Sequence, residues 1–178
     1  MIPGVGNGDV YLFAVTRAPG APVMLIPDPY SRAFIARDMF LLSSVADSAF
    51  EWTDAEFVPD PIETLVLYQL NIHTFTPEGT WVAATARLPE IVSLGVNCIA
   101  LMPHTQDIHP VCWGYDPISL TAAHCKFGTL RELKVFVNAC HQHGLAVLFD
   151  WVPNHLHITN ILYPVHATDE KGYFDPST

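Results

Sequence analysis

The chain has 178 residues, half of them hydrophobic, and carries a formal net charge of −10 with only 8 lysine and arginine residues. This charge disfavours nucleic acid and anionic membranes as partners, because phosphate recognition depends on clustered cations. No apolar run approaches the roughly 18 residues of a membrane-spanning helix, and the amino terminus lacks the basic start and apolar core of a signal peptide. A neutral ligand fits this composition better.

The four cysteines stand at positions 98, 112, 125 and 140, and none forms a Cys-x-x-Cys pair. Without such a pair, neither a zinc site nor a redox motif is predicted. Cys98 and Cys140 lie in apolar surroundings, which favours buried free thiols. We therefore expect a cytoplasmic protein without a cofactor.

The first 60 residues are rich in proline, glycine and aromatic side chains. Short β-like pieces such as residues 9–15 alternate with turn signals, and residues 27–30 are expected to form a turn or an irregular link. The glycines at positions 4, 6 and 8 precede the first strand-like run, so they lack the strand–loop–helix context of a phosphate loop. The prolines at 59 and 61 mark an expected junction, with one domain over residues 1–60 and another over residues 61–178.

An alternation of strand and helix begins near residue 65. Strand-like apolar runs occupy residues 65–72, 96–102 and 145–149, and a helical pattern follows each of the first two. Apolar strands joined by amphipathic helices predict a parallel sheet, so the expected fold class is α/β. Periodicity alone leaves open a doubly wound sheet or an unfinished (β/α) barrel, because a full barrel needs eight units and about 250 residues.

Two helices are expected between these strands. Thr80 is a candidate cap for the first helix, Pro89 predicts a kink or a restarted turn within it, and Gly95 ends it. Thr129 and Glu132 have the spacing of a capping box at the start of the second. The second helix is expected to bury Leu130, Leu133, Val137 and Cys140 and to end at Gly144.

Polar and aromatic residues follow each of the three strands. The candidates are Asn71 and His73 after the first strand, Trp113 and Tyr115 after the second, and Asp150, Asn154 and His155 after the third. They are expected on one face, because the carboxyl ends of parallel strands meet there. Aromatic rings stack on sugar rings, while Asp, Asn and His bind hydroxyl groups, so this set fits a polyhydroxylated ligand.

Plain structural roles stay open for some of these residues. Trp113 is equally well explained as a packing residue beneath its loop, and an aspartate at a strand end, such as Asp150, often caps the next turn. His155 and His157 could bracket a metal, but no convincing third ligand accompanies them, so no metal site is predicted.

Several of these segments, in this order, resemble the α-amylase family (glycoside hydrolase family 13). Residues 67–76 resemble the first barrel strand and its exit loop, and residues 94–103 the second strand. Residues 113–117 are similar to the loop whose tyrosine contacts the sugar at the cleavage site, and residues 150–155 to the first family signature. Within the family, the likeness is to α-glucan branching enzymes and to trehalose-forming trehalohydrolases.

The resemblance implies a fold in two parts. Residues 1–60 resemble the later part of the glucan-binding β-sandwich module that precedes the barrel in these enzymes. Residues 61–178 would then form the N-terminal part of a (β/α)8 TIM barrel, with about three β/α units. The chain thus resembles an enzyme of this family truncated at both ends.

The resemblance also implies substrate-binding roles. Tyr115 would form the platform for the sugar whose bond is broken, with Trp113 counted beside it. Asp150 and His155 would support that sugar, and Asn154 would hold the loop without binding a metal. The family's nucleophile and acid/base follow later strands. The chain is therefore expected to contain no catalytic residue and to be inactive alone.

Three functional hypotheses follow, each with an α-1,4-glucan as partner. The first is a 1,4-α-glucan branching enzyme, which transfers an α-1,4-glucan segment to a 6-hydroxyl with retention; residues 28–30 and 172–174 favour it. The second is a malto-oligosyltrehalose trehalohydrolase, which residues 76–80 suit. The third is a non-catalytic glucan-binding remnant.

Overall fold

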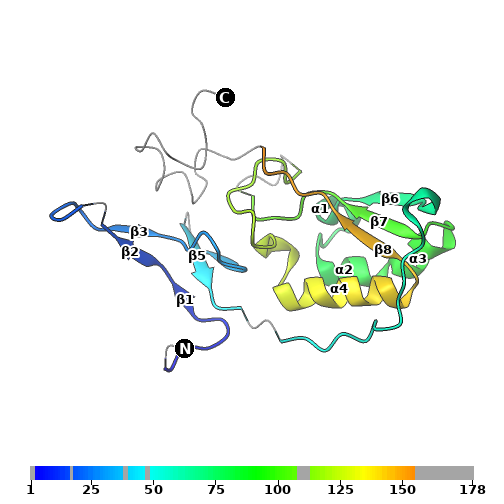
Figure 1. Ribbon diagram of the computed structural model, residues 1–178, viewed down its shortest axis with the longest axis horizontal. Coiled ribbons are helices and arrows are strands. Elements are labelled where there is room, and N and C mark those ends of the chain that lie inside the picture. The colour runs from blue at the N-terminus through cyan, green and yellow to red at the C-terminus, as the bar shows by residue number, and fades with distance from the viewer. Residues whose placement is uncertain (1–2, 17, 38–39, 47–48, 108–112, 155–178) are drawn as a thin grey trace.

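A computed structural model describes residues 3–16, 18–37, 40–46, 49–107 and 113–154. Antiparallel strands form the amino-terminal part, and an α/β unit follows it (Figure 1). Within these residues, no helix has the length and apolar character that crossing a membrane requires.

The amino-terminal strands form two small antiparallel sheets. One contains β1 (Val10–Tyr11), β5 (Phe40–Ser44) and β4 (Phe34–Arg37) in that order, and β2 (Phe13–Val15) pairs with β3 (Met24–Ile26) in the other. The strand expected over residues 9–15 is therefore wrong as a single element, because it divides at Leu12 between two sheets. Alternating hydrophobicity indicates extended backbone, but it does not show where the chain passes from one pairing strand to another.

The turn expected over residues 27–30 is confirmed, and Asp28 organises it. Its carboxylate accepts hydrogen bonds from the Tyr11 hydroxyl at 2.7 Å and from the Tyr30 amide at 2.8 Å. The Ser31 amide closes the turn by donating to the Asp28 carbonyl oxygen at 3.0 Å. An aspartate that bonds an amide two residues later is a common way to stabilise such a turn.

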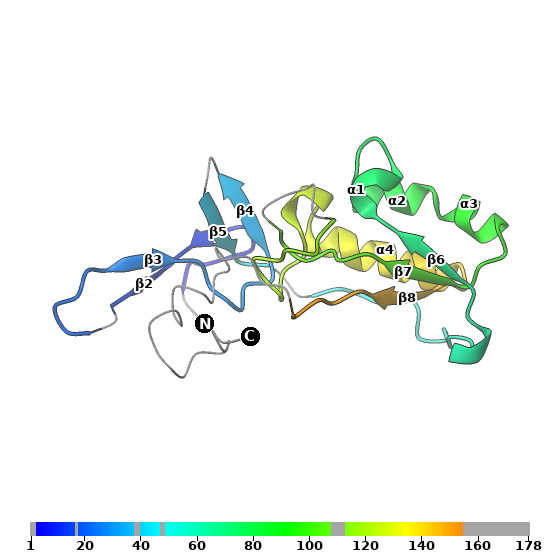
Figure 2. The same cartoon turned by 90° about the horizontal axis from the view of Figure 1, so that it is seen from above.

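The α/β unit is built on a parallel sheet, as the sequence predicts. β6 (Leu67–Leu70), β7 (Cys98–Leu101) and β8 (Ala146–Phe149) lie in the order β6-β7-β8. The connections contain α1 (Ile72–Phe75), α2 (Trp81–Ala86), α3 (Leu88–Ser93) and α4 (Leu130–Gln142), and the short η1 (Ile62–Thr64) and η3 (Cys125–Phe127) precede β6 and α4. Helices α2, α3 and α4 pack against the sheet through a shared core (Figure 2).

The local signals for the helices are confirmed. Thr80 accepts a hydrogen bond from the Ala83 amide, and the helix stops at Ala86 and restarts with Pro89 in the first turn of α3. Thr129 and Glu132 make the expected reciprocal capping box at the start of α4. Gly95 and Gly144 follow the two helical segments with positive φ angles of 79° and 75°.

The first strand of the sheet is shorter than the strand predicted over residues 65–72. It ends at Leu70, and the Asn71 side chain accepts a hydrogen bond from the His73 amide at 2.9 Å. This bond starts the single turn of α1. An asparagine side chain that binds a nearby amide competes with continued sheet pairing, which explains the early stop.

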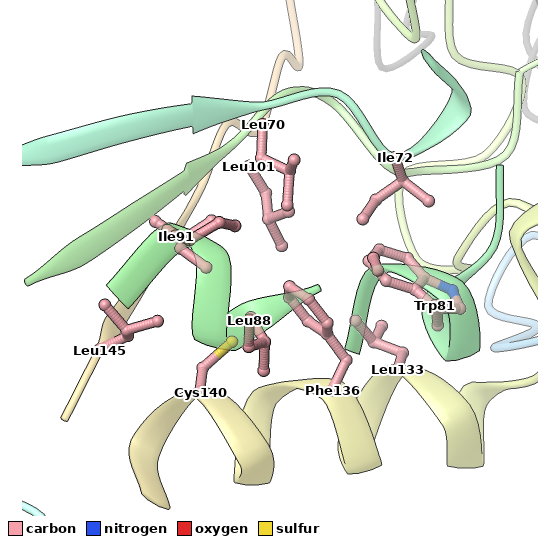
Figure 3. Close-up of a cluster of buried hydrophobic side chains, with 12 residues drawn as sticks. Leu70, Ile72, Trp81, Leu88, Ile91, Leu101, Leu133, Phe136, Cys140 and Leu145 are labelled. Atoms are coloured by element: carbon pink, nitrogen blue, oxygen red, sulfur yellow. The ribbon is translucent and has the colours of Figure 1, made fainter. Parts of the chain in front are cut away.

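The core lies between the sheet and the helices (Figure 3). It contains Leu70, Ile72, Trp81, Ala84, Leu88, Ile91, Ile99, Leu101, Leu133, Phe136, Cys140 and Leu145. Phe136 is fully buried in the middle of α4, whereas Leu130 and Val137 of the predicted stripe pack at the edge. Cys98 and Cys140 are buried free thiols, as expected, and burial raises the pKa of Cys140 to about 12.

The segment between the two parts of the chain is bound along α4. Thr53 exchanges two hydrogen bonds with the Asn138 side chain, each 2.9 Å long. The His141 ring contacts the Asp54 carboxylate on one side and stacks on Phe57, with 4.3 Å between ring centroids. The linking segment is therefore held by α4 through side-chain contacts.

Asn97 joins the start of β7 to the segment before β6, and we expect Asn97→Ala to lower the free energy of unfolding by about 1–2 kcal/mol. The side-chain nitrogen of Asn97 donates to the Asp60 carboxylate at 2.7 Å and to the Thr64 carbonyl at 3.2 Å. The side-chain oxygen accepts from the backbone amide of Val66 at 2.7 Å. Urea unfolding measures the loss. The exposed Glu63, changed to Gln, serves as a control, and equal stability of the two variants would contradict the expectation.

Candidate functional site

Tyr115 and Asp150 meet at the carboxyl ends of the parallel strands. The Tyr115 hydroxyl donates a hydrogen bond to the Asp150 carboxylate at 2.8 Å across 35 positions of sequence. The Asp150 amide donates to the Leu101 carbonyl at 3.0 Å, which fixes Asp150 directly after β8. The hydrogen bond to Asp150, with burial and the charge of the carboxylate, raises the pKa of Tyr115, so its hydroxyl stays protonated as the donor.

Trp113 lies two residues before Tyr115 and is 61% exposed, so the alternative of a packing residue beneath the loop is wrong. Its backbone has a positive φ of 54°, which is uncommon for a bulky residue. Gly114 follows with φ 83°, and a Cβ there would lie 2.2 Å from the Pro103 carbonyl oxygen. The close approach to Pro103 therefore requires glycine and presents the indole outward.

A second contact links the exit of β8 to the same loop. The Trp151 indole nitrogen donates to the Leu120 carbonyl at 3.3 Å. Trp151 is 58% exposed, and Phe149, which directly precedes Asp150, is 46% exposed. Asp150 is therefore flanked in sequence by exposed aromatic surface, the kind of surface on which sugar rings stack.

The remaining predicted site residues follow Asp150. Asn154 is exposed in the turn after it. His155 lies outside the described residues. The structure thus brings together Tyr115 and Asp150, places Trp113 in the loop of Tyr115, and places Asn154 four residues beyond Asp150.

Gln106 holds the long loop after β7 and was missed by the sequence analysis. It is buried, its side-chain oxygen accepts from the Cys125 amide at 2.9 Å, and its amide nitrogen donates to the Asp107 carbonyl at 2.9 Å. Its backbone also bonds to Ala122 and Ile118. A single glutamine in an irregular segment has no periodic signal, so nothing in the sequence pattern identifies it.

Two histidines in the segment between β7 and η3, His104 and His124, are held neutral by burial, and the sequence analysis missed both. Burial lowers the pKa of His104 to about 4. Burial, together with the charges of Lys126 and His73, lowers the pKa of His124 to about 4. The His124 Nδ1 atom accepts a hydrogen bond from the Lys126 amide at 3.2 Å, which requires an unprotonated nitrogen.

We expect the free energy of unfolding to fall as the pH drops from 6.5 towards 4. An unfolded histidine, with a pKa near 6.5, gains a proton in this range, while the folded His104 and His124, with pKa values of about 4, do not. Each contributes a slope approaching about 1.4 kcal/mol per pH unit, which vanishes above pH 6.5. Unfolding curves at several pH values measure it.

The histidine variants separate this effect from other titrations. His124→Gln and His104→Gln should each reduce the slope by about 1.4 kcal/mol per pH unit, because each removes one of the two histidines with a lowered pKa. An undiminished slope in His124→Gln would contradict the assignment to His124.

In the described part of the chain, no group of three His, Cys, Asp or Glu side chains could hold a metal ion. At the site, Asp150, Tyr115 and Asn154 supply hydrogen-bonding groups, and the exposed aromatic rings supply surfaces for stacking.

A family model described as alpha amylase, catalytic domain, matches residues 40–172. The chain belongs to the α-amylase family. This identification confirms the resemblance found in the sequence and agrees with the α/β fold. The family placement rests on most of the chain and not on the first signature alone.

Named relatives of two kinds match the chain. A malto-oligosyltrehalose trehalohydrolase of Deinococcus radiodurans is 37% identical over 85% of this chain and 24% of the relative. A 1,4-alpha-glucan branching enzyme of Burkholderia thailandensis is 32% identical over 86% of this chain and 20% of the relative. The chain therefore spans about a quarter of the length of the curated relatives it matches.

A solved structure is similar as well. The crystal structure of a Salmonella typhimurium protein assigned as an alpha amylase superposes with a TM-score of 0.80 at 37% identity. The match covers 90% of this chain and 27% of the other.

Proposed function

We propose that this chain supplies the sugar-binding side of an α-glucan-active enzyme. The observation that carries the proposal is the hydrogen bond between Tyr115 and Asp150 at the carboxyl ends of the parallel strands, in a chain of the α-amylase family. Active sites of (β/α) barrels are built at this end of the strands. The ligand proposed for the site is an α-1,4-glucan.

The proposed roles follow from the side chains. Asp150 would accept hydrogen bonds from sugar hydroxyl groups while Tyr115 fixes its orientation and offers a ring face. Trp113 would add a second aromatic face, and Asn154 and His155 would support the loop and the sugar. We propose no catalytic residue, metal or cofactor in this chain. Its residues orient the sugar, and the retaining reaction needs a further pair of carboxylates about 5–5.5 Å apart.

The proposed architecture has two domains. Residues 61–178 would be the N-terminal part of a (β/α)8 barrel, and the order β6-β7-β8 with helices packed on the sheet supports this. Residues 1–60 would be the later part of a glucan-binding β-sandwich, which the two antiparallel sheets support. A cytoplasmic location is also proposed, because the described cysteines are free thiols, the usual state in a reducing compartment.

Branching is the reaction we propose first, namely transfer of an α-1,4-glucan segment to a 6-hydroxyl. The turn at residues 28–30, which favours branching enzymes by resemblance, is well formed around Asp28. It also contacts the loop of the site, because the Thr121 hydroxyl lies 3.2 Å from the Pro29 carbonyl oxygen and 2.9 Å from the carbonyl oxygen of the following Ser31. Branching enzymes of two further bacteria match this chain at 30% and 31% identity.

Trehalose release is the second candidate reaction. Trehalohydrolases match at 37% identity, above the 32% of the branching enzyme just described. The segment 76–80 that suits this group forms a tight turn, in which Gly79 has φ 62° and its amide bonds to the Thr76 hydroxyl at 3.1 Å. A Cβ at Gly79 would lie 2.9 Å from the His73 carbonyl oxygen, so the turn requires glycine.

Product analysis separates the two reactions. The longest polypeptide that the native gene encodes is incubated with amylose and, separately, with a maltooligosyltrehalose. New α-1,6 linkages in the amylose, seen by NMR without a rise in reducing ends, identify branching, whereas free trehalose identifies the hydrolase. Glucan binding with neither product supports a non-catalytic role, and the absence of glucan binding would overturn the proposal.

A further inference from the structure

A cleft of about 640 Å³ lies between the amino-terminal sheet and the start of α4. One wall comes from β4 and from the end of β5 with the residues after it, and the other from residues 123–131, where η3 leads into α4. Tyr115 and Asp150 do not line it. The volume lies within the range of about 300–1,000 Å³ that is typical of small-molecule sites.

Two arginines line this cleft from opposite walls, Arg32 before β4 and Arg131 in the first turn of α4. None of the lining residues that the structure describes is acidic, and no described ion pair includes either arginine. The chain has 8 lysines and arginines against 18 acidic residues. Because acidic residues outnumber basic ones, a cleft chosen at random would be expected to contain more carboxylates than guanidinium groups. This cleft has two guanidinium groups and, among its described lining residues, no carboxylate.

The position of Arg131 is not explained by the stability of α4. A cation in the first turn opposes the helix dipole, which favours negative groups there. The neighbouring Glu132 carboxylate is occupied, since it accepts from the Thr129 amide at 2.7 Å and from the Thr129 hydroxyl at 3.0 Å. The Arg131 guanidinium lies 6.0 Å from the centroid of the Phe50 ring, a cation–π contact that holds it in place.

The rest of the lining is mostly apolar with a few small polar groups. Apolar wall is supplied by Phe34, Ile35, Val45 and Leu130, and polar groups by Asn7, Ser44 and Thr129. A planar guanidinium group can donate two parallel hydrogen bonds to phosphate oxygens, whereas a lysine ammonium acts as a point charge. Apolar wall beside them suits the carbon-bearing face of a sugar ring.

We propose that this cleft binds a phosphate monoester carried on a sugar, with Arg32 and Arg131 as the groups that contact the phosphate. The site is separate from the Tyr115–Asp150 site and does not depend on the reaction proposed there. Two sources share this chemistry, a free sugar phosphate and a phosphate ester on a glucan chain.

Equilibrium dialysis of the 178-residue chain against glucose 6-phosphate, in phosphate-free buffer with 50 mM salt, tests the proposal. We expect saturable binding of one ligand per chain, and no saturable binding of glucose or maltotriose at the same concentrations. Arg32→Gln and Arg131→Gln should each weaken binding about tenfold or more. Arg37→Gln removes an exposed charge of β4 that does not line the cleft and should leave the affinity unchanged.

The outcomes separate the proposal from its alternatives. Equal binding of maltotriose would overturn it in favour of a neutral glucan site, and unchanged affinity in both cleft variants would place the phosphate elsewhere. Absence of saturable binding also overturns it.

Thermal melting of each variant shows whether the fold is kept. A phosphorylated maltooligosaccharide that binds tenfold tighter than glucose 6-phosphate identifies a glucan ester as the source, and equal affinity identifies the free sugar phosphate.

Discussion

We expect Phe136→Ala to lower the free energy of unfolding by about 3–5 kcal/mol, which is a large share of the stability of an ordinary domain. The Phe136 ring is fully buried between α4 and the sheet (Figure 3). Its centroid lies 5.6 Å from that of Trp81, so truncation removes an aromatic contact as well as buried area. The cavity would lie at the centre of the core, where neighbours on all sides hold it open.

Urea unfolding followed by circular dichroism measures the loss, and two further variants calibrate it. Phe136→Leu keeps most of the apolar volume and should cost clearly less than alanine. Val135→Ala changes the preceding residue of α4, which is 37% exposed, and should cost under about 1 kcal/mol. If Phe136→Ala and Val135→Ala lost the same stability, the ring would not be central to the core.

Phe136 also shows what a hydrophobic pattern can and cannot predict. Residues at positions 130, 133, 137 and 140 define an apolar stripe on α4, and the sequence predicted its helix, cap and end correctly. The pattern fixes a face about 100° wide but not its centre. The centre is set by α2 and the sheet, which contact Leu133, Phe136 and Cys140 most deeply. Partners distant in sequence leave no mark on local periodicity.

The same limit explains the amino-terminal strands and part of the site. Leu12 separates two strands because β1 and β2 have different partners, which no local pattern records. Tyr115 and Asp150 were predicted on one face because parallel strands impose it, and they are in contact. The exposure of Trp113 follows from a positive φ and the close approach of Gly114 to Pro103, which hydrophobicity does not reveal.

We expect Asp150→Ala to reduce turnover of α-1,4-glucan at least about 100-fold in the longest polypeptide that the native gene encodes, on the proposed function. Asp150 is fixed by its own amide bond to Leu101 and by the Tyr115 hydroxyl. Its removal takes away the carboxylate proposed to bind the sugar and also leaves the Tyr115 hydroxyl without its acceptor. Misplacement of a bound substrate by about 1 Å suffices for losses of this order.

Tyr115→Phe distinguishes binding by the ring from binding by the carboxylate. This variant keeps the aromatic face but loses the 2.8 Å hydrogen bond that orients Asp150. We expect a smaller loss in kcat/KM, about tenfold, which corresponds to about 1.4 kcal/mol of transition-state stabilisation. Steady-state rates on amylose, or trehalose release if that is the product, measure both variants.

Glu78→Gln is the matched control, because Glu78 is an exposed carboxylate in the turn that follows α1. Its rate and melting temperature should equal those of the unchanged protein.

If Asp150→Ala kept full activity while folding normally, the proposed sugar-binding site would have to lie elsewhere. If instead Asp150→Ala unfolded, Asp150→Asn would decide between the two roles, since the amide oxygen can still accept from Tyr115 but the negative charge is gone. A large loss of rate in a folded Asp150→Asn would show that the charge acts on the substrate and not only on the loop.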